Sequence, residues 1–343
     1  MEKVMKLKAT FIIMIILASC AKPIRKKSVK ISVIQKETKK ILAVQQKRLY
    51  PICNLEGCGF IDESGNIQIK NQYQETKNFS NGFAAVMKDG LWGYINQRGI
   101  KVIHTQYDWA GNFIHNLAAV SKNSKWGCIN SSGKIVIPFE YESLKILERD
   151  RISVSKDGKW GIIDQKNKIV ISIVYDQIGN SGQNLVPVKK DGFFGYLTLN
   201  GNLKIKHQFD QAFHFKDGLA LVVLKGKYGF INQRGQFILP FKYDWAASFS
   251  NGLAPIMKEA KVGFINKKGK LVIKPQFDHA RPFYSGLAAV KINGKYGFIN
   301  RQGKVVIRPQ FDSVQNFKGK IAGILMNGKF SYINKNDQIV WKE

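Results

Sequence analysis

Acidic residues are scarce in this sequence: 24 Asp and Glu stand against 54 Lys and Arg, and the formal net charge is +30. Residues 21–48 carry +9 of this surplus, and the residues after them carry about +19. Such an imbalance favours contact with anionic surfaces through long-range attraction. We therefore expect an anionic partner, such as acidic lipid, lipopolysaccharide or wall polymer. The alternative is a lysine-rich surface that is only solvated.

Long apolar runs are missing beyond the N-terminus, although a membrane helix needs about 20 consecutive apolar residues. The stretch Ala9–Leu17 is roughly half that length. It follows three lysines and precedes the tetrapeptide LASC, which ends at Cys20. This arrangement resembles the lipobox of bacterial lipoproteins. The resemblance implies that residues 1–19 are a lipoprotein signal peptide and that Cys20 carries the lipid. An ordinary secretory signal or a short membrane helix is the alternative.

Residues 20–47 separate this signal from the rest of the chain and are rich in lysine. We interpret them as a basic tether in which Val29–Lys47 has the pattern of an amphipathic helix. Such a helix could lie on an anionic membrane or cap the segment that follows it. Because Ala21-Lys22 lacks the Asp that retains enteric lipoproteins at the inner membrane, we expect the outer membrane or the cell surface.

Recognisable catalytic and metal-binding motifs are absent as well. The sequence has no nucleophile elbow, P-loop or dinucleotide fingerprint. Its five histidines form no HxH or HExxH spacing. We therefore predict no enzyme activity, no cofactor and no metal site. An exported protein is also not expected to bind nucleic acid. A secreted enzyme that acts on wall or glycan through an unrecognised site is the alternative.

A 34-residue repeat governs the sequence from Arg48 onward, and the stretch YGFINRQGKVVIRPQF at Tyr296–Phe311 is its clearest copy. The period is kept without insertion or deletion. The aromatic-Gly pair that opens each copy occurs at Trp92-Gly93, Trp126-Gly127, Trp160-Gly161, Phe194-Gly195, Tyr228-Gly229 and Tyr296-Gly297, and in degraded form at Cys58-Gly59, Val262-Gly263 and Phe330-Ser331.

Each repeat has the pattern of a three-stranded β-meander. In the copy that begins at Gly286, Asn293-Gly294 is a strong signal for a two-residue hairpin turn. Two further strands follow, and Pro309 is expected to end the third because it lacks an N–H. Phe298 and Ile299 point to opposite faces, so both faces must be covered by neighbouring repeats. Gly297 is expected to permit close approach of such a neighbour.

Nine whole units fit between residues 48 and 343. The sequence therefore predicts an all-β fold of nine stacked repeats. An open solenoid or superhelix is favoured, because closed propellers usually have four to eight blades and often share strands between the chain ends. A closed β-propeller is the alternative.

The repeat resembles the WG, or KWG, β-repeat family of bacterial proteins over residues 48–343. The shared pattern is W-G-[aromatic]-I-N-x-x-G-K-x-V-I-x-P-x-F-D, followed later by G-L-A-A-V. The units that begin at 150 and 184 depart most, with Asp150, Ser181 and Asn167 at unusual positions. The resemblance implies extracytoplasmic or interaction roles and carries no catalytic residues.

Lysines and acids recur at fixed positions of the repeat. An acid follows the aromatic residue after the third strand in seven of eight linkers, and we expect it to accept backbone N–H bonds rather than to bind calcium. Lysines just before the second strand are candidate contacts for an anionic partner. The acids are Asp108, Glu142, Asp176, Asp210, Asp244, Asp278 and Asp312, and the lysines are Lys125, Lys159, Lys227, Lys261, Lys295 and Lys329.

The repeat register also predicts a disulfide between Cys53 and Cys58. Seven periods later these positions are Lys291 and Tyr296, which flank a hairpin turn as a non-hydrogen-bonded pair. Such a pair lies within disulfide reach, and export permits oxidation. Cys128 falls on a buried register and should remain a free thiol.

Taken together, these patterns predict a lipid-anchored cell-envelope protein that binds or scaffolds proteins or anionic envelope polymers. A purely structural spacer is a further alternative.

Overall fold

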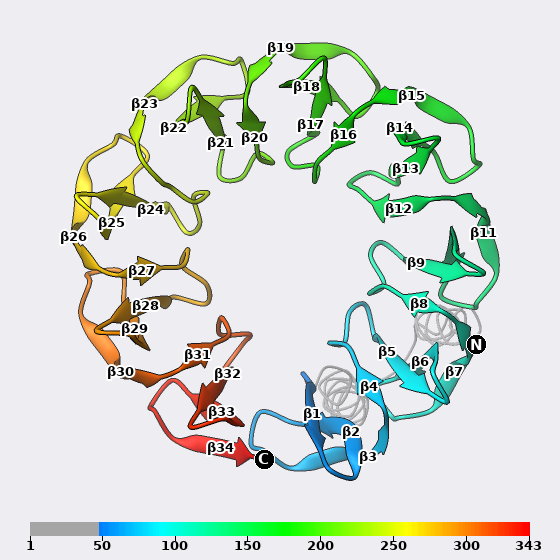
Figure 1. The fold of residues 1–343 in the computed structure, drawn as a ribbon. Helices are drawn as coiled ribbons and strands as arrows, with labels where there is room; N and C mark the ends of the chain where they lie inside the picture. Colours follow the sequence, from blue (N-terminus) through cyan, green and yellow to red (C-terminus); the bar gives the residue numbers. More distant parts are fainter. Residues whose placement is uncertain (1–47) are drawn as a thin grey trace, which may run out of the picture. The chain divides into compact units, whose positions relative to one another are not determined.

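Nine small antiparallel sheets, one for each repeat, form a closed ring in the computed structural model, which describes residues 48–343 (Figure 1). The predicted signal peptide, the predicted lipidation site Cys20 and the predicted tether at 20–47 lie outside the described residues. We number the sheets as blades I to IX in chain order. The all-β prediction with nine repeats is confirmed.

Blades contain up to four strands, which follow one another from the centre of the ring to its edge (Figure 1). The innermost strands are β4 (Glu75–Thr76), β8 (Trp109–Ala110), β12 (Ser143–Ile146), β16 (Gln177–Ile178), β20 (Gln211–Ala212), β27 (His279–Ala280) and β31 (Ser313–Val314). The second strands are β1 (Tyr50–Asn54), β5 (Phe83–Lys88), β9 (Leu117–Lys122), β13 (Ile152–Lys156), β17 (Leu185–Lys190), β21 (Leu219–Leu224), β24 (Leu253–Lys258), β28 (Ala288–Ile292) and β32 (Ile321–Met326).

The two outer positions repeat in every blade. The third strands are β2 (Gly57–Ile61), β6 (Leu91–Asn96), β10 (Lys125–Asn130), β14 (Lys159–Ile163), β18 (Phe193–Thr198), β22 (Lys227–Asn232), β25 (Lys261–Asn266), β29 (Lys295–Ile299) and β33 (Lys329–Asn334). The outer strands are β3 (Ile67–Tyr73), β7 (Lys101–Tyr107), β11 (Ile135–Tyr141), β15 (Ile169–Tyr175), β19 (Leu203–Phe209), β23 (Phe237–Tyr243), β26 (Leu271–Phe277), β30 (Val305–Phe311) and β34 (Ile339–Lys342).

The innermost strand was not predicted, because most copies are only two residues long. In blade VII a single bridge between Ala246 and Ile256 takes its place. The prediction that Pro309 ends a strand is also wrong, since β30 continues to Phe311. Pro309 instead lies in a bulge of β30, where a residue without an N–H is tolerated.

That bulge explains the glycine of the aromatic-Gly pair. Tyr296 pairs with Phe311 and Phe298 pairs with Ile307, so three residues of β30 face Gly297. A Cβ on Gly297 would lie 2.5 Å from the carbonyl oxygen of Ile307. The close approach therefore comes from the same blade, and the expectation that a neighbouring repeat requires it is wrong.

Neighbouring blades are joined by pairs of aromatic rings. The aromatic residue of a third strand packs on a phenylalanine from the inner loop of the next blade, as Phe298 does on Phe317 with ring centroids 4.8 Å apart. Phe298 and Ile299 are both buried, which confirms that each sheet is covered on both faces. The same pairing occurs for Phe60–Phe79, Tyr94–Phe113, Tyr196–Phe215, Phe230–Phe249 and Phe264–Phe283.

The ring closes between blades I and IX. Tyr50 and Ile52 of β1 share a buried cluster with Ile321 and Tyr332 of blade IX. The hydroxyl of Tyr332 also donates a hydrogen bond of 2.8 Å to the carbonyl oxygen of Pro51. The open solenoid that the sequence favoured is therefore replaced by its alternative, a propeller. The closing contact is made by side chains between two separate sheets, so no strand has to be shared.

Candidate binding surfaces

Loops at the two ends of the strands give the ring two faces with different electrostatics. The first, which we call the hairpin face, consists of the two-residue turns between second and third strands together with the linkers that follow the outer strands. In blade VIII this turn is Asn293-Gly294, with φ angles of 48° and 82°. Both values lie in the left-handed region, as the Asn-Gly sequence predicted.

Each linker acid binds the turn beside it. Asp312 accepts a hydrogen bond of 2.8 Å from the backbone N–H of Asn327 and forms a 2.5 Å ion pair with Lys295. Glu142 accepts from the backbone N–H groups of Asp157 and Gly158 at 3.0 and 3.1 Å. The prediction that these acids accept backbone N–H bonds is confirmed for all of them except Asp244, whose partner is Lys227. The lysine partner was not predicted.

Four of the six lysines proposed from the sequence are held in such ion pairs. Their hydrogen bonds are the main cause that lowers the pKa of the Asp176, Asp278 and Asp312 carboxyls. Within residues 48–343, Lys125 and Lys329 form no ion pair. The four pairs are Lys159–Asp176 at 2.6 Å, Lys227–Asp244 at 2.5 Å, Lys261–Asp278 at 2.6 Å and Lys295–Asp312 at 2.5 Å.

Charges on the hairpin face balance. The four-residue hairpin segments, residues 54–57 and their repeats, contain twelve lysines and five acids, and the linkers add seven acids. The net charge of this face is therefore zero, although lysine is its most frequent residue. An anionic partner gains little long-range attraction from such a surface.

The opposite face, which we call the basic face, consists of the inner loops and of the turns between third and outer strands. Eight of these turns in the described part begin with an Asn or Asp and the turn of blade V begins with Thr198. Asn300 Oδ1, for example, accepts backbone N–H bonds of 3.1 and 3.0 Å from Gln302 and Lys304. Lys335 reaches from its turn to the carbonyl oxygen of Ser285 in the preceding blade at 2.7 Å. The turns thereby brace the inner loops.

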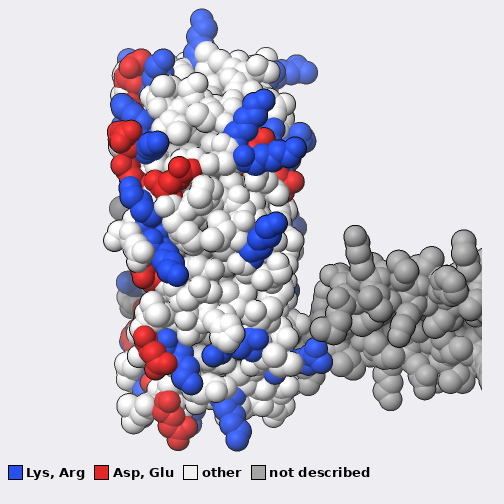
Figure 2. All heavy atoms as spheres, turned by 90° about the vertical axis from the view of Figure 1, so that its right-hand side faces the viewer, with Lys and Arg blue, Asp and Glu red and all other residues white. Residues whose placement is uncertain are grey.

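Basic side chains outnumber acids on these turns. Residues 62–68 and their repeats contain thirteen Lys and Arg against four acids, a surplus of nine. Figure 2 shows the asymmetry at one side of the ring, where acidic and basic atoms alternate along one edge and basic atoms dominate the other. The basic residues are Arg98, Lys101, Lys134, Lys166, Lys168, Lys204, Arg234, Lys267, Lys268, Lys270, Arg301, Lys304 and Lys335.

Arg48, the first described residue, lies on the basic face. Its guanidinium, the Glu63 carboxylate and the Tyr50 hydroxyl surround Gly319, where an added Cβ would lie 2.6 Å from Arg48 Nη1. Glu63 belongs to a turn of this face and forms a 3.2 Å ion pair with Lys320 of an inner loop. The N-terminal end of the described part therefore lies on the basic side of the propeller.

An aromatic cluster lies on the inner wall of blades II and III. The ammonium of Lys77 lies 3.7 Å from the Trp109 ring centroid and donates a 2.7 Å hydrogen bond to the Ala110 carbonyl oxygen. Burial lowers the pKa of Lys77. Trp109 remains 39% exposed. A hollow of about 450 Å³ lies nearby, lined by Ser80, Asn81, Phe113, Ile114, His115 and Asn116.

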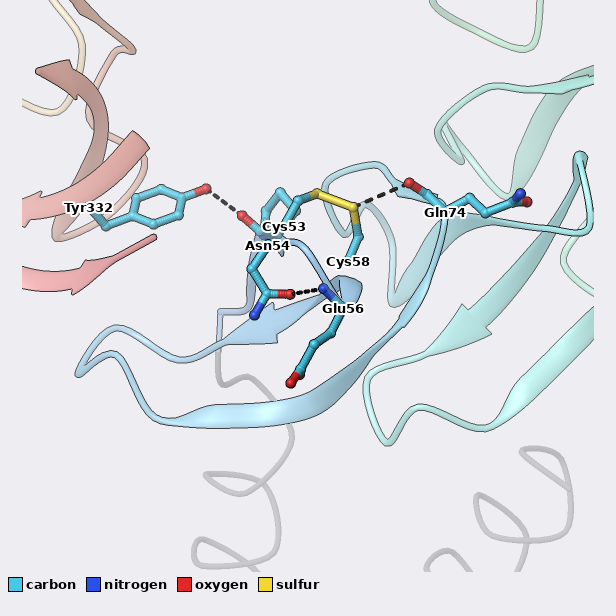
Figure 3. The surroundings of a disulfide bond; sticks show 7 residues. Cys53, Asn54, Glu56, Cys58, Gln74 and Tyr332 are labelled. Atoms are coloured by element: carbon cyan, nitrogen blue, oxygen red, sulfur yellow. Dashed lines mark hydrogen bonds between the residues drawn. A yellow bond between two sulfur atoms is a disulfide. The ribbon is translucent and has the colours of Figure 1, made fainter. Parts of the chain in front are cut away.

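The two cysteines of β1 and β2 face each other across their hairpin (Figure 3). Their sulfurs form a disulfide with a Cα–Cα distance of 4.0 Å. Residues 55 and 56 of this turn have no positive φ, and Asn54 Oδ1 accepts the Glu56 N–H at 3.0 Å. Cys128 is a buried free thiol, as predicted, and burial raises its pKa to about 12.

No group of three or more His, Cys, Asp or Glu side chains converges within residues 48–343. No helix in this part is long and apolar enough to cross a membrane.

Several comparisons place the chain among known proteins. A crystal structure of the eukaryotic initiation factor has a TM-score of 0.64 and 12% sequence identity, and the match covers 87% of this chain and 96% of that one. Dihydro-heme d1 dehydrogenase NirN, in complex with DHE, matches with a TM-score of 0.48 and 10% identity over 86% and 77% of the chains. The 12% identity of the initiation factor indicates a shared fold alone.

A search of curated proteins finds no match to this sequence. The family model of the WG containing repeat matches eight consecutive copies, at residues 59–92, 92–126, 126–160, 160–192, 194–228, 228–261, 263–296 and 296–330. The chain therefore belongs to the WG repeat family.

Proposed function

We propose that this protein is a lipid-anchored binding or scaffold protein of the cell envelope, which meets a negatively charged partner through the basic face of its propeller. The observation that carries the proposal is the unequal charge of the two faces, with a surplus of nine on the turns of one and none on the hairpins and linkers of the other taken together. Acylated Cys20 supplies the anchor, and the hairpin face stays open to protein partners.

Four of the lysines on the hairpin face are already paired with acids of the same blade, so they are less available to an anionic partner. The main anionic contact therefore falls on the basic face rather than on the lysines expected from the sequence. Exposed charges are screened within about 8 Å at physiological ionic strength, so binding should weaken steeply as salt is added.

Retention on immobilised heparin, used as a model polyanion, tests this assignment. The basic-face variant Lys268→Gln/Lys270→Gln/Lys304→Gln should elute at clearly lower salt than the wild type. The hairpin-face variant Lys227→Gln/Lys261→Gln/Lys295→Gln removes the same charge and serves as the matched control. Equal shifts would show that only net charge matters and would contradict the proposed face.

Anchoring is tested separately by mass spectrometry of the protein purified from membranes of its own host. The mature chain should begin at Cys20 and carry lipid, and Cys20→Ala should abolish acylation. A mature chain that begins elsewhere without lipid would show that the anchoring part of the proposal is wrong.

A further inference from the structure

Apolar side chains form a ring around the outer edge of the basic face. Each is the first residue of an outer strand, directly after the basic turn, and eight of the nine blades carry one. Their exposed fractions lie between 40% and 59%, and Lys101 occupies the ninth position. The eight residues, which we call the apolar ring, are Ile67, Ile135, Ile169, Leu203, Phe237, Leu271, Val305 and Ile339.

The core contact of an outer strand is made by another residue, two positions later. In β19, Ile205 is 5% exposed whereas Leu203 is 55% exposed. Single exposed apolar residues are common on protein surfaces. Eight at one register form instead a repeated apolar row that is interrupted only at Lys101, and exposed apolar surface gathered in one place marks interaction sites.

We propose that the basic face lies flat on an anionic lipid membrane, with the apolar ring in the interfacial layer and the turn lysines and arginines at the headgroups. This inference rests on the proposed function and names the partner of the same face. Amphipathic surfaces that combine apolar and basic side chains bind membranes in two ways: they bury apolar area at the interface, and their cations are attracted to anionic lipids. Lys134, Lys168, Lys270 and Lys304 directly precede ring residues, so their ammonium groups can extend to lipid phosphates.

Other occupants use only part of this surface. A second copy of the chain would bring two basic faces together, and their charges would repel. An anionic polymer would pair with the lysines but leave the apolar ring in water. A lipid surface satisfies both groups, and Arg48 on this face connects the propeller to the segment that leads back to Cys20.

Vesicle flotation of the mature chain with Cys20→Ala tests the inference without the lipid anchor. The wild-type propeller should bind vesicles of phosphatidylglycerol and phosphatidylcholine. The ring variant Ile169→Ser/Leu203→Ser/Phe237→Ser should bind at least about tenfold more weakly. It lacks the apolar groups that become partly buried in the bilayer when the wild type binds. The control Leu55→Ser/Leu91→Ser/Phe193→Ser removes exposed apolar residues of the hairpin face and should bind like the wild type. The tether is identical in all three proteins.

A fluorescence measurement keeps the test independent of any folding defect in the triple variant. Phe237→Trp should add an emission component that shifts to the blue with anionic vesicles, whereas Phe193→Trp on the hairpin face should not. Equal vesicle binding by ring and control variants, or no shift at position 237, would overturn the inference. Retained heparin binding without vesicle binding would leave the proposed function intact, and loss of both would contradict the two together.

Discussion

Tyr332 in the last blade donates its hydroxyl hydrogen to the carbonyl oxygen of Pro51 in the first, across 281 residues of sequence. Burial raises the pKa of Tyr332, so the hydroxyl keeps its proton and remains a donor at neutral pH. Its counterparts inside the ring make similar bonds between adjacent blades: Tyr94 donates to Gly111 at 2.7 Å and Tyr196 to Phe213 at 2.8 Å.

Removal of this hydroxyl tests ring closure in solution. Tyr332→Phe should lower the free energy of unfolding by about 1 kcal/mol, because a largely buried hydrogen bond is lost. Tyr94→Phe, within the ring, is the matched control and should cost a similar amount. Urea denaturation measures both. No effect at Tyr332 alongside a normal effect at Tyr94 would show that the seam is open.

The Cys53–Cys58 disulfide should contribute about 2 kcal/mol in the chain-entropy model, because it closes a short loop. Reductant should therefore lower the unfolding midpoint of the wild type but leave that of Cys53→Ser/Cys58→Ser unchanged. Non-reducing peptide mapping of protein purified from the envelope checks the link directly. Two free thiols in that protein would contradict the pairing.

Gly297→Ala should destabilise the propeller by roughly 1–3 kcal/mol, the usual cost of overpacking. The new methyl group would meet the backbone of β30 at 2.5 Å. Blade IX provides the control: Ser331 stands at the glycine register, and there Ser331 pairs with Lys342 and Tyr332 with Trp341 without a bulge between them. Ser331→Ala should therefore be much milder. Equal thermal midpoints for the two variants would refute the bulge explanation.

Acid should destabilise the fold below about pH 6.5. Burial is the main cause that lowers the pKa of His207, His214 and His279 below the ordinary value of 6.5, and nearby cationic side chains add to it. The unfolded chain then binds more protons, so stability is lost as the pH falls through this range. The triple His→Gln variant should show a flatter dependence of the urea midpoint on pH. An unchanged dependence would rule out these histidines as its source.

The structure within each repeat was predictable because the residues that determine its turns and buried positions recur in the sequence of each copy. The Asn293-Gly294 turn, the buried pair Phe298 and Ile299, and the free thiol of Cys128 all follow from period, alternation and turn residues, and the structure confirms them. The two-residue inner strands gave no periodic signal, because two residues are too few to show one.

Relations between repeats were harder to predict. The Lys295–Asp312 pair spans 17 residues across a bulged strand, and the sequence does not reveal that bulge. Closure depends on Tyr50 and Tyr332, whose contact has no counterpart inside a single repeat. The basic face was missed for a related reason: both ends of the hairpins are rich in lysine, and only the spatial pairing with acids shows which end is neutral.

Closure by side chains also bears on how such genes change. Recombination between two repeats adds or removes a whole blade, since every repeat has the same length. Both halves of the seam, Tyr50 and Tyr332, lie in the outermost copies and survive such an exchange. Rings with one blade more or fewer would keep the same closing contact between Tyr50 and Tyr332. Selection would then need to adjust only the small rotation between neighbouring sheets.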